Sequence, residues 1–442
     1  MPRRRKQLPT GSGEAVIESL SHEGRGISHI DGKTVFVDGA LPGETVKFKY
    51  TSQRSKFDEG AATEILNASA LRVNPGCEYF SVCGGCSLQH MHSEAQIQHK
   101  ETVLFEQLKH IGGVEPADKL MPITGQVWGY RHKARLGVKY VFKKGKVLVG
   151  FREKNKPYIA EIDHCEVLHP TIGKNLLALK ELINSLDIKS EIPQIEVAVG
   201  DDGAMIVIRH LVGLSAEDRV KLAQFESTYN ISVLLQGNHA ETIVPLAENG
   251  ADSLVYTLEE YGIDFRFSPL DFTQINFKIN REMIARVIQL LQPAKTEHLL
   301  DLFCGMGNFT LPLAKHAAFV TGIEGMASLV EKARMNAVRN NIDNVAFQKS
   351  NLYAAVIKEE FVNGKFDKVL MDPPRSGAKE IIEQMNFDNV HRLVYVSCNP
   401  ATLARDSGIL VNQRGFKLVS AGVMDMFPHT THVESIAVFE HS

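Results

Sequence analysis

The last part of the chain alternates short apolar runs with helical patterns, and this alternation restricts the fold more than any other feature of the sequence. Five runs are typical of buried strands, at residues 299–303, 319–323, 345–348, 368–371 and 393–397. Helical patterns lie between most of them, which predicts a parallel sheet covered by helices on both faces. We therefore expect an α/β domain over residues 269–442, with a further β-rich run at 433–439.

The bulk composition is that of an ordinary soluble protein. Of the 442 residues, 44% are hydrophobic and 23% charged, and no apolar run reaches the length of a membrane span. No apolar segment follows the basic start, so it is not a secretory signal. Six cysteines are too few for a disulfide scaffold. We expect a cytoplasmic protein without a membrane partner, and since the net charge is -3, nucleic-acid binding would need local basic patches.

Residues 1–68 are predicted to form a basic arm, at Arg3 to Lys6, followed by a small β-barrel. Short β-rich runs at 15–17, 33–37 and 45–50 are separated by glycine-containing turns. Five short strands over this length suggest a compact barrel of the OB type, which is a frequent platform for nucleic acids. The composition alone fits any small β-barrel equally well.

Residues 69–268 are predicted to form a central α+β domain, in which Lys143-Lys144-Gly145 closes a hairpin. Residues 129–156 contain ten Lys or Arg and one acid, Glu153. Four aromatic residues are interleaved with these cations: Tyr130, Tyr140, Phe142 and Phe151. Because cations neutralise phosphates and aromatic rings stack on unpaired bases, we expect this stretch to bind RNA. The alternative is a solvated hairpin face without a ligand.

A glycine-containing loop follows the first strand of the α/β domain and predicts a cofactor pocket. Gly305-x-Gly307 lacks the third glycine of a dinucleotide fingerprint, because Thr310 occupies that position. Glu324 ends the next strand and can accept the hydroxyl protons of a ribose, while Asp301 is expected beside the ligand. We expect a Rossmann-like domain that binds S-adenosylmethionine, which has no pyrophosphate. The alternative is a helix-start turn with a solvated glutamate.

Two further motifs end strands of the same sheet. Asp372-Pro373-Pro374-Arg375 follows the fourth strand, and its prolines stiffen the backbone at the crevice. Cys398 ends the fifth strand, where Asn399-Pro400 interrupts the β pattern, so its thiol is expected at the active edge of the sheet. By themselves these residues also fit a proline turn and a buried structural cysteine.

Beside a methyl donor, a thiol at this position predicts chemistry on a pyrimidine. The C5 atom of uracil is a poor nucleophile, but addition of a thiolate to C6 converts the ring to an enolate and makes C5 reactive. A base must later remove the C5 proton. Glu434, which opens the terminal β-rich run, is the best candidate. The alternative is that Glu434 is a surface carboxylate.

Three motifs together resemble the RNA uracil-C5 methyltransferases over essentially the whole chain. They are Phe303 to Asn308, Asp372 to Arg375, and Ser397 to Asp406. The resemblance implies that Cys398 is the nucleophile and Glu434 the base. It also implies six contacts to S-adenosylmethionine, at Gln274, Phe303, Asn308, Glu324, Asn351 and Asp372; spacing alone does not select Gln274 or Asn351.

Four cysteines outside the α/β domain predict a metal site. Cys77, Cys83 and Cys86 are close in sequence and Cys165 is remote. Four thiolates can hold zinc or an iron–sulfur cluster, but zinc sites usually show two paired Cys-x-x-Cys motifs and only one is present. The resemblance to ribosomal RNA members of the family implies a [4Fe–4S] cluster, with a structural role more readily expected than a redox one.

The N-terminal barrel resembles a TRAM domain, and its combination with four cysteines points to the subclass that methylates uracil in 23S ribosomal RNA. We expect a monomer that acts on this RNA, free or in an assembling large subunit. Methylation of a uridine in transfer RNA or elsewhere in ribosomal RNA is an alternative. An amino-directed methyltransferase, suggested by Asp-Pro-Pro, and a non-enzymatic RNA-binding or redox-sensing protein also remain open.

Overall fold

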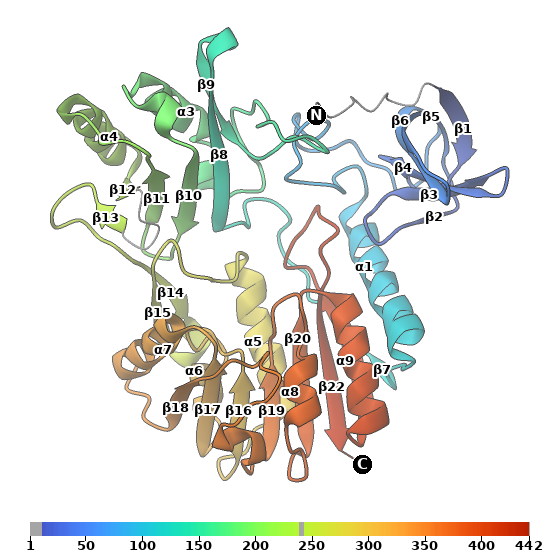
Figure 1. Ribbon diagram of the computed structural model, residues 1–442, viewed down its shortest axis with the longest axis vertical. Coiled ribbons are helices and arrows are strands. Elements are labelled where there is room, and N and C mark those ends of the chain that lie inside the picture. The colour runs from blue at the N-terminus through green and yellow to red at the C-terminus, as the bar shows by residue number, and fades with distance from the viewer. Residues whose placement is uncertain (1–10, 238–242, 442) are drawn as a thin grey trace. The chain divides into compact units, whose positions relative to one another are not determined.

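A computed structural model describes residues 11–237 and 243–441 (Figure 1). The chain divides into two compact units. The smaller unit comprises the described residues up to Phe80, with Gly85–Val103 and Pro428–Thr431, and the remaining described residues form the larger unit. The expected basic arm at Arg3 to Lys6 lies outside the described residues. No described helix combines the length and apolar character needed to cross a bilayer.

The smaller unit is built on a six-stranded sheet with the order β1-β5-β6-β4-β3-β2. Its strands are β1 (Ser12–Val16), β2 (Ser19–Leu20), β3 (Gly26–Ile30), β4 (Lys33–Asp38), β5 (Thr45–Gln53) and β6 (Phe57–Asn67). Alternate residues of a strand face the same side, so Val35, Val37, Val46 and Phe48 form a buried apolar core. The sequence predicts five strands here; the additional one is the two-residue β2, which pairs with β3. Helix α1 (Ser93–Gln107) follows.

The larger unit begins with a second six-stranded sheet, ordered β13-β12-β11-β10-β8-β9. Its strands are β8 (Lys133–Val141), β9 (Lys146–Gly150), β10 (Gln194–Val199), β11 (Ala204–Arg209), β12 (Ile231–Gln236) and β13 (Ile243–Pro245). The helices of this region are α2 (Pro170–Gly173), α3 (Leu176–Ser185) and α4 (Ala216–Tyr229). The predicted hairpin is confirmed: β8 and β9 are antiparallel and joined by a 3-10 turn that ends at Gly145, where φ is 64°. A separate hairpin, β14 (Leu254–Leu258) and β15 (Ile263–Phe267), precedes the third sheet.

The third sheet has eight strands in the order β18-β17-β16-β19-β20-β22-β21-β7. They are β16 (His298–Leu302), β17 (Phe319–Glu324), β18 (Val345–Lys349), β19 (Lys368–Met371), β20 (Arg392–Ser397), β21 (Phe416–Met424), β22 (Glu434–His441) and β7 (Asp118–Lys119). The first five are parallel to one another, as predicted. The terminal run is also a strand, but β22 is antiparallel to β20 and β21, and β21 is not among the predicted strands.

The order of strands creates a switch point between β16 and β19. From β16 the chain adds β17 and β18 on one side, then returns to add β19 and β20 on the other. Because parallel crossovers are right-handed, this reversal sends the connecting helices to opposite faces of the sheet. The helices of the domain are α5 (Phe277–Leu291), α6 (Thr310–Ala314), α7 (Ala327–Arg339), α8 (Lys379–Gln384) and α9 (Pro400–Gln413). Figure 1 shows α8 and α9 side by side along the strands at the C-terminal end of the chain, where the two helices pack together.

One apolar core extends through much of the larger unit. It joins side chains of the second sheet, such as Val207 and Leu234, to side chains of the third, such as Leu299 and Val396. The β14–β15 hairpin contributes Tyr256 and Phe265 to the same core. The predicted boundary at residue 268 therefore lies within a continuous core, and the division at residues 1–68, 69–268 and 269–442 stays a prediction.

A buried carboxylate holds the smaller unit together, and its removal gives a first prediction. Glu44 is fully buried and accepts N–H groups of Leu41 and Ser69 at 2.8 and 3.2 Å and the guanidinium of Arg72. Burial raises the pKa of this carboxyl, but the hydrogen bond from Arg72 and the two backbone donors together hold the pKa below its usual value. Glu44→Gln should destabilise the unit by about 1–3 kcal/mol, because a charged acceptor of several donors is lost. Hydrogen exchange of residues 11–72 in the full chain measures this change.

An exposed glutamate in the same sheet provides the control for Glu44. Glu64 pairs with Lys47 at 2.9 Å, but at least half of each side chain is exposed. Glu64→Gln should alter stability by no more than about 0.5 kcal/mol. Since the pKa of Glu44 is lowered by folding, its contribution should be present above the pKa of the unfolded chain and lost as pH falls through the folded value. Equal exchange in both variants would contradict the prediction.

Candidate active site

A pocket of about 630 Å³ lies at the switch point of the third sheet, where doubly wound sheets bind ligands. All eight residues predicted for catalysis or cofactor binding line this pocket: Gln274, Phe303, Asn308, Glu324, Asn351, Asp372, Cys398 and Glu434. They come from segments that are far apart in the sequence, at the carboxyl ends of the strands and in the segment before α5. The structure therefore brings the predicted residues into one site.

The loop after β16 forms one wall of the pocket. It turns sharply because Phe303, Gly305 and Gly307 have φ values of 66°, 56° and 93°. A non-glycine residue such as Phe303 adopts such a conformation rarely, and functional sites are where this strain is typically found. Gly305 donates its N–H to one oxygen of Glu324 at 3.1 Å, and Met326 donates to the other at 2.9 Å. The carboxylate of Glu324 thus anchors the loop and keeps lone pairs for a ligand hydroxyl.

Asn308, in the same loop, is oriented by a residue outside the predicted set. Its side-chain amide exchanges two hydrogen bonds with the amide of Asn280 on α5, at 3.0 and 3.1 Å. Asn280 also donates to the hydroxyl of Tyr256 at 3.0 Å, and burial raises the pKa of that hydroxyl. The amide of Asn308 is therefore held in one orientation. No local motif marks Asn280, which is an ordinary buried position on an amphipathic helix.

Gln274 lies in the segment that joins β15 to α5. Asp271 holds this segment: its carboxylate accepts the N–H of Ser268 at 2.7 Å and pairs with Lys332 on α7. Lys133 on β8 donates to the backbone carbonyl of Asp271, and burial lowers the pKa of Lys133 to about 8. These contacts of Asp271 hold the segment so that Gln274 lines the pocket. Since the contacts involve β8 and α7, which are distant in the chain, sequence spacing alone does not select Gln274.

Aromatic residues that the sequence analysis does not single out also line the pocket. Tyr256, Phe265 and Phe267 come from the β14–β15 hairpin, and Phe277 comes from the start of α5. The alternation of apolar and charged residues in β15 is the signal that could have placed two of them on a buried face. Beyond β18, Asn351 accepts the N–H of Tyr353 at 3.1 Å, and the ring of Tyr353 lies 5.7 Å from that of Phe303.

Two aspartates near the pocket have raised pKa values, for the same reason. Asp372 follows β19 and lines the pocket, and burial raises the pKa of its carboxyl to about 7. Asp301 on β16 is fully buried and accepts the hydroxyl of Thr310 at 2.5 Å. Burial raises its pKa to about 7 as well. Asp301 is not among the residues that line the pocket, and its carboxyl accepts its hydrogen bond from Thr310 at the start of α6, so its expected position beside the ligand stays a prediction.

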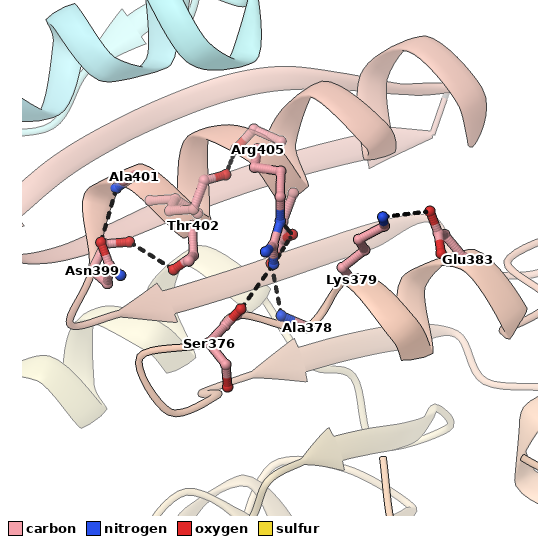
Figure 2. Close-up of polar contacts among 12 residues, drawn as sticks. Ser376, Ala378, Lys379, Glu383, Asn399, Ala401, Thr402 and Arg405 are labelled. Carbon is pink, nitrogen blue, oxygen red and sulfur yellow. Dashed lines mark hydrogen bonds and ion pairs between the residues drawn. The ribbon is translucent and has the colours of Figure 1, made fainter. Parts of the chain in front are cut away.

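Cys398 sits at the carboxyl end of β20, and the helix α9 begins immediately after it. Asn399 caps this helix through a 3.1 Å hydrogen bond from the N–H of Ala401, as Figure 2 shows. The thiol is half-buried and lines the pocket. Burial, followed by the carboxylates of Glu434 and Asp372, raises the pKa of Cys398 to about 11, against the opposing effect of the Arg375 guanidinium. The thiol is therefore protonated at neutral pH in the free protein.

Glu434 reaches the pocket because of the antiparallel pairing of β22 with β20. In this register Ser397 faces Ser435, whose hydroxyl donates to the carbonyl of Ser397 at 3.1 Å. Glu434 therefore lies beside the strand end that carries Cys398, and only 3% of the residue is exposed. The alternative of a surface carboxylate is wrong.

The basic stretch at residues 129–156 differs from the prediction in two respects. Tyr130 is buried, with 1% of the residue exposed, so its ring cannot stack on a base. The cations are also less isolated than the sequence suggests, because Glu161 pairs with Lys144 and Lys146, and Glu196 pairs with Arg135. Phe142, at the tip of the hairpin, is 78% exposed and is the ring best placed to stack on a nucleotide.

The four cysteines of the predicted metal site are all half-buried. Gly84 donates its N–H to the backbone carbonyl of Arg152 at 2.8 Å, and Cys165 donates its N–H to the backbone carbonyl of Gly173 at 3.0 Å. Within the described ranges, no group of three or more His, Cys, Asp or Glu side chains is arranged to hold a metal ion. Cys304 is a buried residue of the cofactor loop and lines the pocket; burial raises the pKa of its thiol, and its expected inert role stays a prediction.

Known proteins resemble this chain over its full length. A curated relative from Nitrosococcus oceani, named 23S rRNA (uracil(1939)-C(5))-methyltransferase RlmD, is 52% identical, with 99% of this chain and 98% of the relative covered. A relative of the same name from Hahella chejuensis is 50% identical, with 100% of both chains covered. Among solved structures, a Pyrococcus abyssi tRNA (uracil-54, C5)-methyltransferase in complex with S-adenosyl-L-homocysteine has a TM-score of 0.73 and 26% identity, covering 97% of this chain and 100% of that one.

Two family models match the sequence. The TRAM domain matches residues 14–60, which confirms the nature of the N-terminal barrel. The model described as tRNA (Uracil-5-)-methyltransferase matches residues 203–442, more than half of the chain and the whole of the third sheet except β7. Together with the site geometry and the full-length relatives, this match shows that the chain belongs to the tRNA (uracil-5-)-methyltransferase family, the RNA uracil-C5 methyltransferases.

Proposed function

We propose that this protein transfers a methyl group from S-adenosylmethionine to C5 of a uridine in 23S ribosomal RNA, through a covalent adduct with Cys398. The observation that carries the proposal is the pocket in which Cys398, Glu434 and the six predicted cofactor contacts converge. The names of the relatives that match this chain over its full length support 23S ribosomal RNA as the substrate. The protein is expected to act as a monomer in the cytoplasm, on free or assembling RNA.

The residues around Cys398 would perform the reaction in three steps. The sulfur of Cys398 forms a bond to C6 of uracil as the thiol proton passes to water, and the C5–C6 π electrons move onto the ring carbonyl oxygen as an enolate. S-adenosylmethionine would supply the methyl group, which bonds to C5 as its bond to the sulfonium sulfur breaks. Glu434 takes the C5 proton, the electrons of that C–H bond restore the C5–C6 double bond, and the bond between Cys398 and C6 breaks to release a thiolate, which takes a proton from water.

Electrostatics explains why the free site would be unreactive. With a pKa of about 11, Cys398 carries its proton until a substrate and a base are in place. The charges of Glu434 and Asp372 disfavour the thiolate form of Cys398, and the positive charge of Arg375 favours it. We infer that addition of the sulfur and loss of its proton occur together, with the uracil already bound.

We propose further that Cys77, Cys83, Cys86 and Cys165 bind a [4Fe–4S] cluster. Thiolate is the ligand that such clusters use, and the four half-buried cysteines supply the required number. The backbone beside Cys83 and Cys165 is fixed by hydrogen bonds and close approaches: a Cβ on Gly173 would meet the carbonyl oxygen of Cys165 at 2.3 Å. Such a cluster would supply a covalent link between distant segments, and methyl transfer does not require electron transfer from it.

Deletion of the gene tests the substrate. Ribosomal RNA from a strain without this protein should lack one methyl group on one 23S uridine by mass mapping. Wild-type protein should restore that methyl group, and Cys398→Ala should not, because C5 stays unreactive without the C6 adduct. Loss of a transfer-RNA methyl group instead would overturn the choice of RNA, and full activity of Cys398→Ala would indicate an amino-directed methyltransferase.

The pH dependence of Cys398 alkylation tests the electrostatics. Because thiolate is the reactive form and the pKa is about 11, alkylation by iodoacetamide should rise about tenfold per pH unit from pH 7 to 10. Glu434→Gln removes a charge that raises this pKa, so its curve should shift to lower pH. Arg375→Gln should shift the curve to higher pH. Mass spectrometry of the peptide that contains Cys398 measures the rate, and a shift of either curve in the opposite direction would contradict the account.

Metal content tests the cluster. Protein purified without oxygen should contain about four iron atoms per chain and show a broad visible absorption band. Cys165→Ser should lose both signals, whereas Cys304→Ser, which changes a buried cysteine outside the proposed ligand set, should keep them. Stoichiometric zinc without iron would replace the cluster by a structural zinc site.

A further inference from the structure

A buried carboxylate, Asp406, lies behind the proposed nucleophile and is not used by the chemistry above. It sits on α9 and is completely buried. One of its oxygens accepts the N–H of Ala378 and the hydroxyl of Tyr395, both at 2.7 Å. Its other oxygen accepts the guanidinium of Arg405 at 2.7–2.8 Å. A carboxylate buried at this depth needs such partners, and here every partner belongs to the segments that surround Cys398.

These partners fasten the loop after β19 to the helix after Cys398. Arg405 extends across the loop and donates to the carbonyl of Ser376 at 2.9 Å. The carbonyl of Arg375 accepts the side-chain amide of Asn399 at 2.9 Å and the hydroxyl of Thr402 at 3.3 Å. Figure 2 shows Asn399, Thr402 and Arg405 on one helix, with Ser376 and Ala378 on the loop that faces it. Residues 375–378 are thus attached to α9 at successive positions.

Gly377 shows how closely the loop approaches the helix. Its φ of +81° is one that side chains rarely adopt. A Cβ at this position would lie 2.5 Å from the guanidinium of Arg405 and 2.5 Å from the carboxylate of Asp406. On its outer side the loop contacts the cofactor wall, because Tyr353 donates to the carbonyl of Gly377 at 3.0 Å and accepts the hydroxyl of Ser376 at 2.9 Å. The loop therefore connects the cofactor side of the pocket to the nucleophile side.

We propose that Asp406 is a positioning residue, which holds the 375–378 loop so that Asp372 and Arg375 face Cys398 in the geometry required for reaction. Asp372 and Arg375 line the pocket at the start of this loop, while Cys398 precedes the helix that carries Asp406. Their mutual placement therefore depends on how the loop and the helix are joined. The expected loss of methylation activity rests on the proposed function, whereas the expected change in Cys398 alkylation does not.

An amide cannot replace this carboxylate. Asp406 accepts on both oxygens and faces donors on both sides, whereas asparagine presents one acceptor and one donor. In Asp406→Asn the NH₂ group must oppose either Arg405 or the N–H of Ala378, so one of the two attachments is lost. The titratable groups that surround Asp406 are Tyr395, Tyr353, Arg405 and Glu380. The charged groups that shift the pKa of Cys398 are Glu434, Asp372 and Arg375.

Two variants test the proposal in the full-length protein. Asp406→Asn removes an attachment, and Gly377→Ala pushes the loop off the helix with every polar partner kept. In both we expect kcat for RNA methylation to fall about 100-fold with KM for RNA unchanged, since small displacements at a reacting centre have effects of this size. We also expect the midpoint pH of Cys398 alkylation to fall, because a loosened loop admits water around a thiol whose pKa is raised mainly by burial.

Asp218→Asn is the matched control for a purely structural effect. Asp218 is also completely buried and accepts the N–H of Asp187 at 2.8 Å, but it lies on α4, in the second sheet region. Asp218→Asn changes a fully buried carboxylate remote from the pocket, so it should leave kcat and the alkylation curve of Cys398 unchanged. The proposal is wrong if the folded Asp406 and Gly377 variants keep the wild-type kcat and alkylation curve, or if Asp218→Asn shifts that curve equally. Alkylation requires no RNA, so failure of the wild type to methylate RNA would refute the proposed function and leave this comparison intact.

Discussion

The placement of β22 between β20 and β21 is the constraint on which the active site depends. Cys398 and Glu434 are separated by a helix, a strand and a loop, and neither has a catalytic partner next to it in the sequence. The antiparallel register that opposes Ser397 to Ser435 brings both to one end of the sheet. The switch point between β16 and β19 then places the cofactor loop beside them. Backbone pairing therefore decides which side chains can react together.

Burial has a common electrostatic effect within this pocket. Desolvation is the largest cause of the raised pKa of Cys398, about 11, and it raises the pKa of Asp372 to about 7. Both groups therefore remain neutral up to a higher pH than exposed groups of the same type, since burial disfavours the charged form. We infer that the Cys398 thiol loses its proton only when uracil occupies the pocket.

Much of the fold and most of the site could be predicted from local patterns. The five parallel strands are recognisable because buried strands are continuous apolar runs, and Cys398, Asp372 and Phe303 follow the ends of such runs. Asn280 and Asp406 could not be found in this way. Each is a polar residue on an amphipathic helix, and most of its partners lie on other elements. The position of Asp301 near the end of a strand suggests a place beside the ligand. In the structure this carboxyl is fully buried and accepts a hydrogen bond from the hydroxyl of Thr310.

The sequence by itself determined the class of fold and the type of cofactor, and it predicts the reactive thiol, because each depends on residue types at short spacing. Only the tertiary structure decided that Glu434 faces the thiol, that Glu161 and Glu196 partly neutralise the basic stretch, and that Tyr130 is unavailable for stacking. These outcomes depend on strand register and on contacts between segments distant in the chain. Local periodicity reports which face of an element is buried, and contains no information about which other element covers that face.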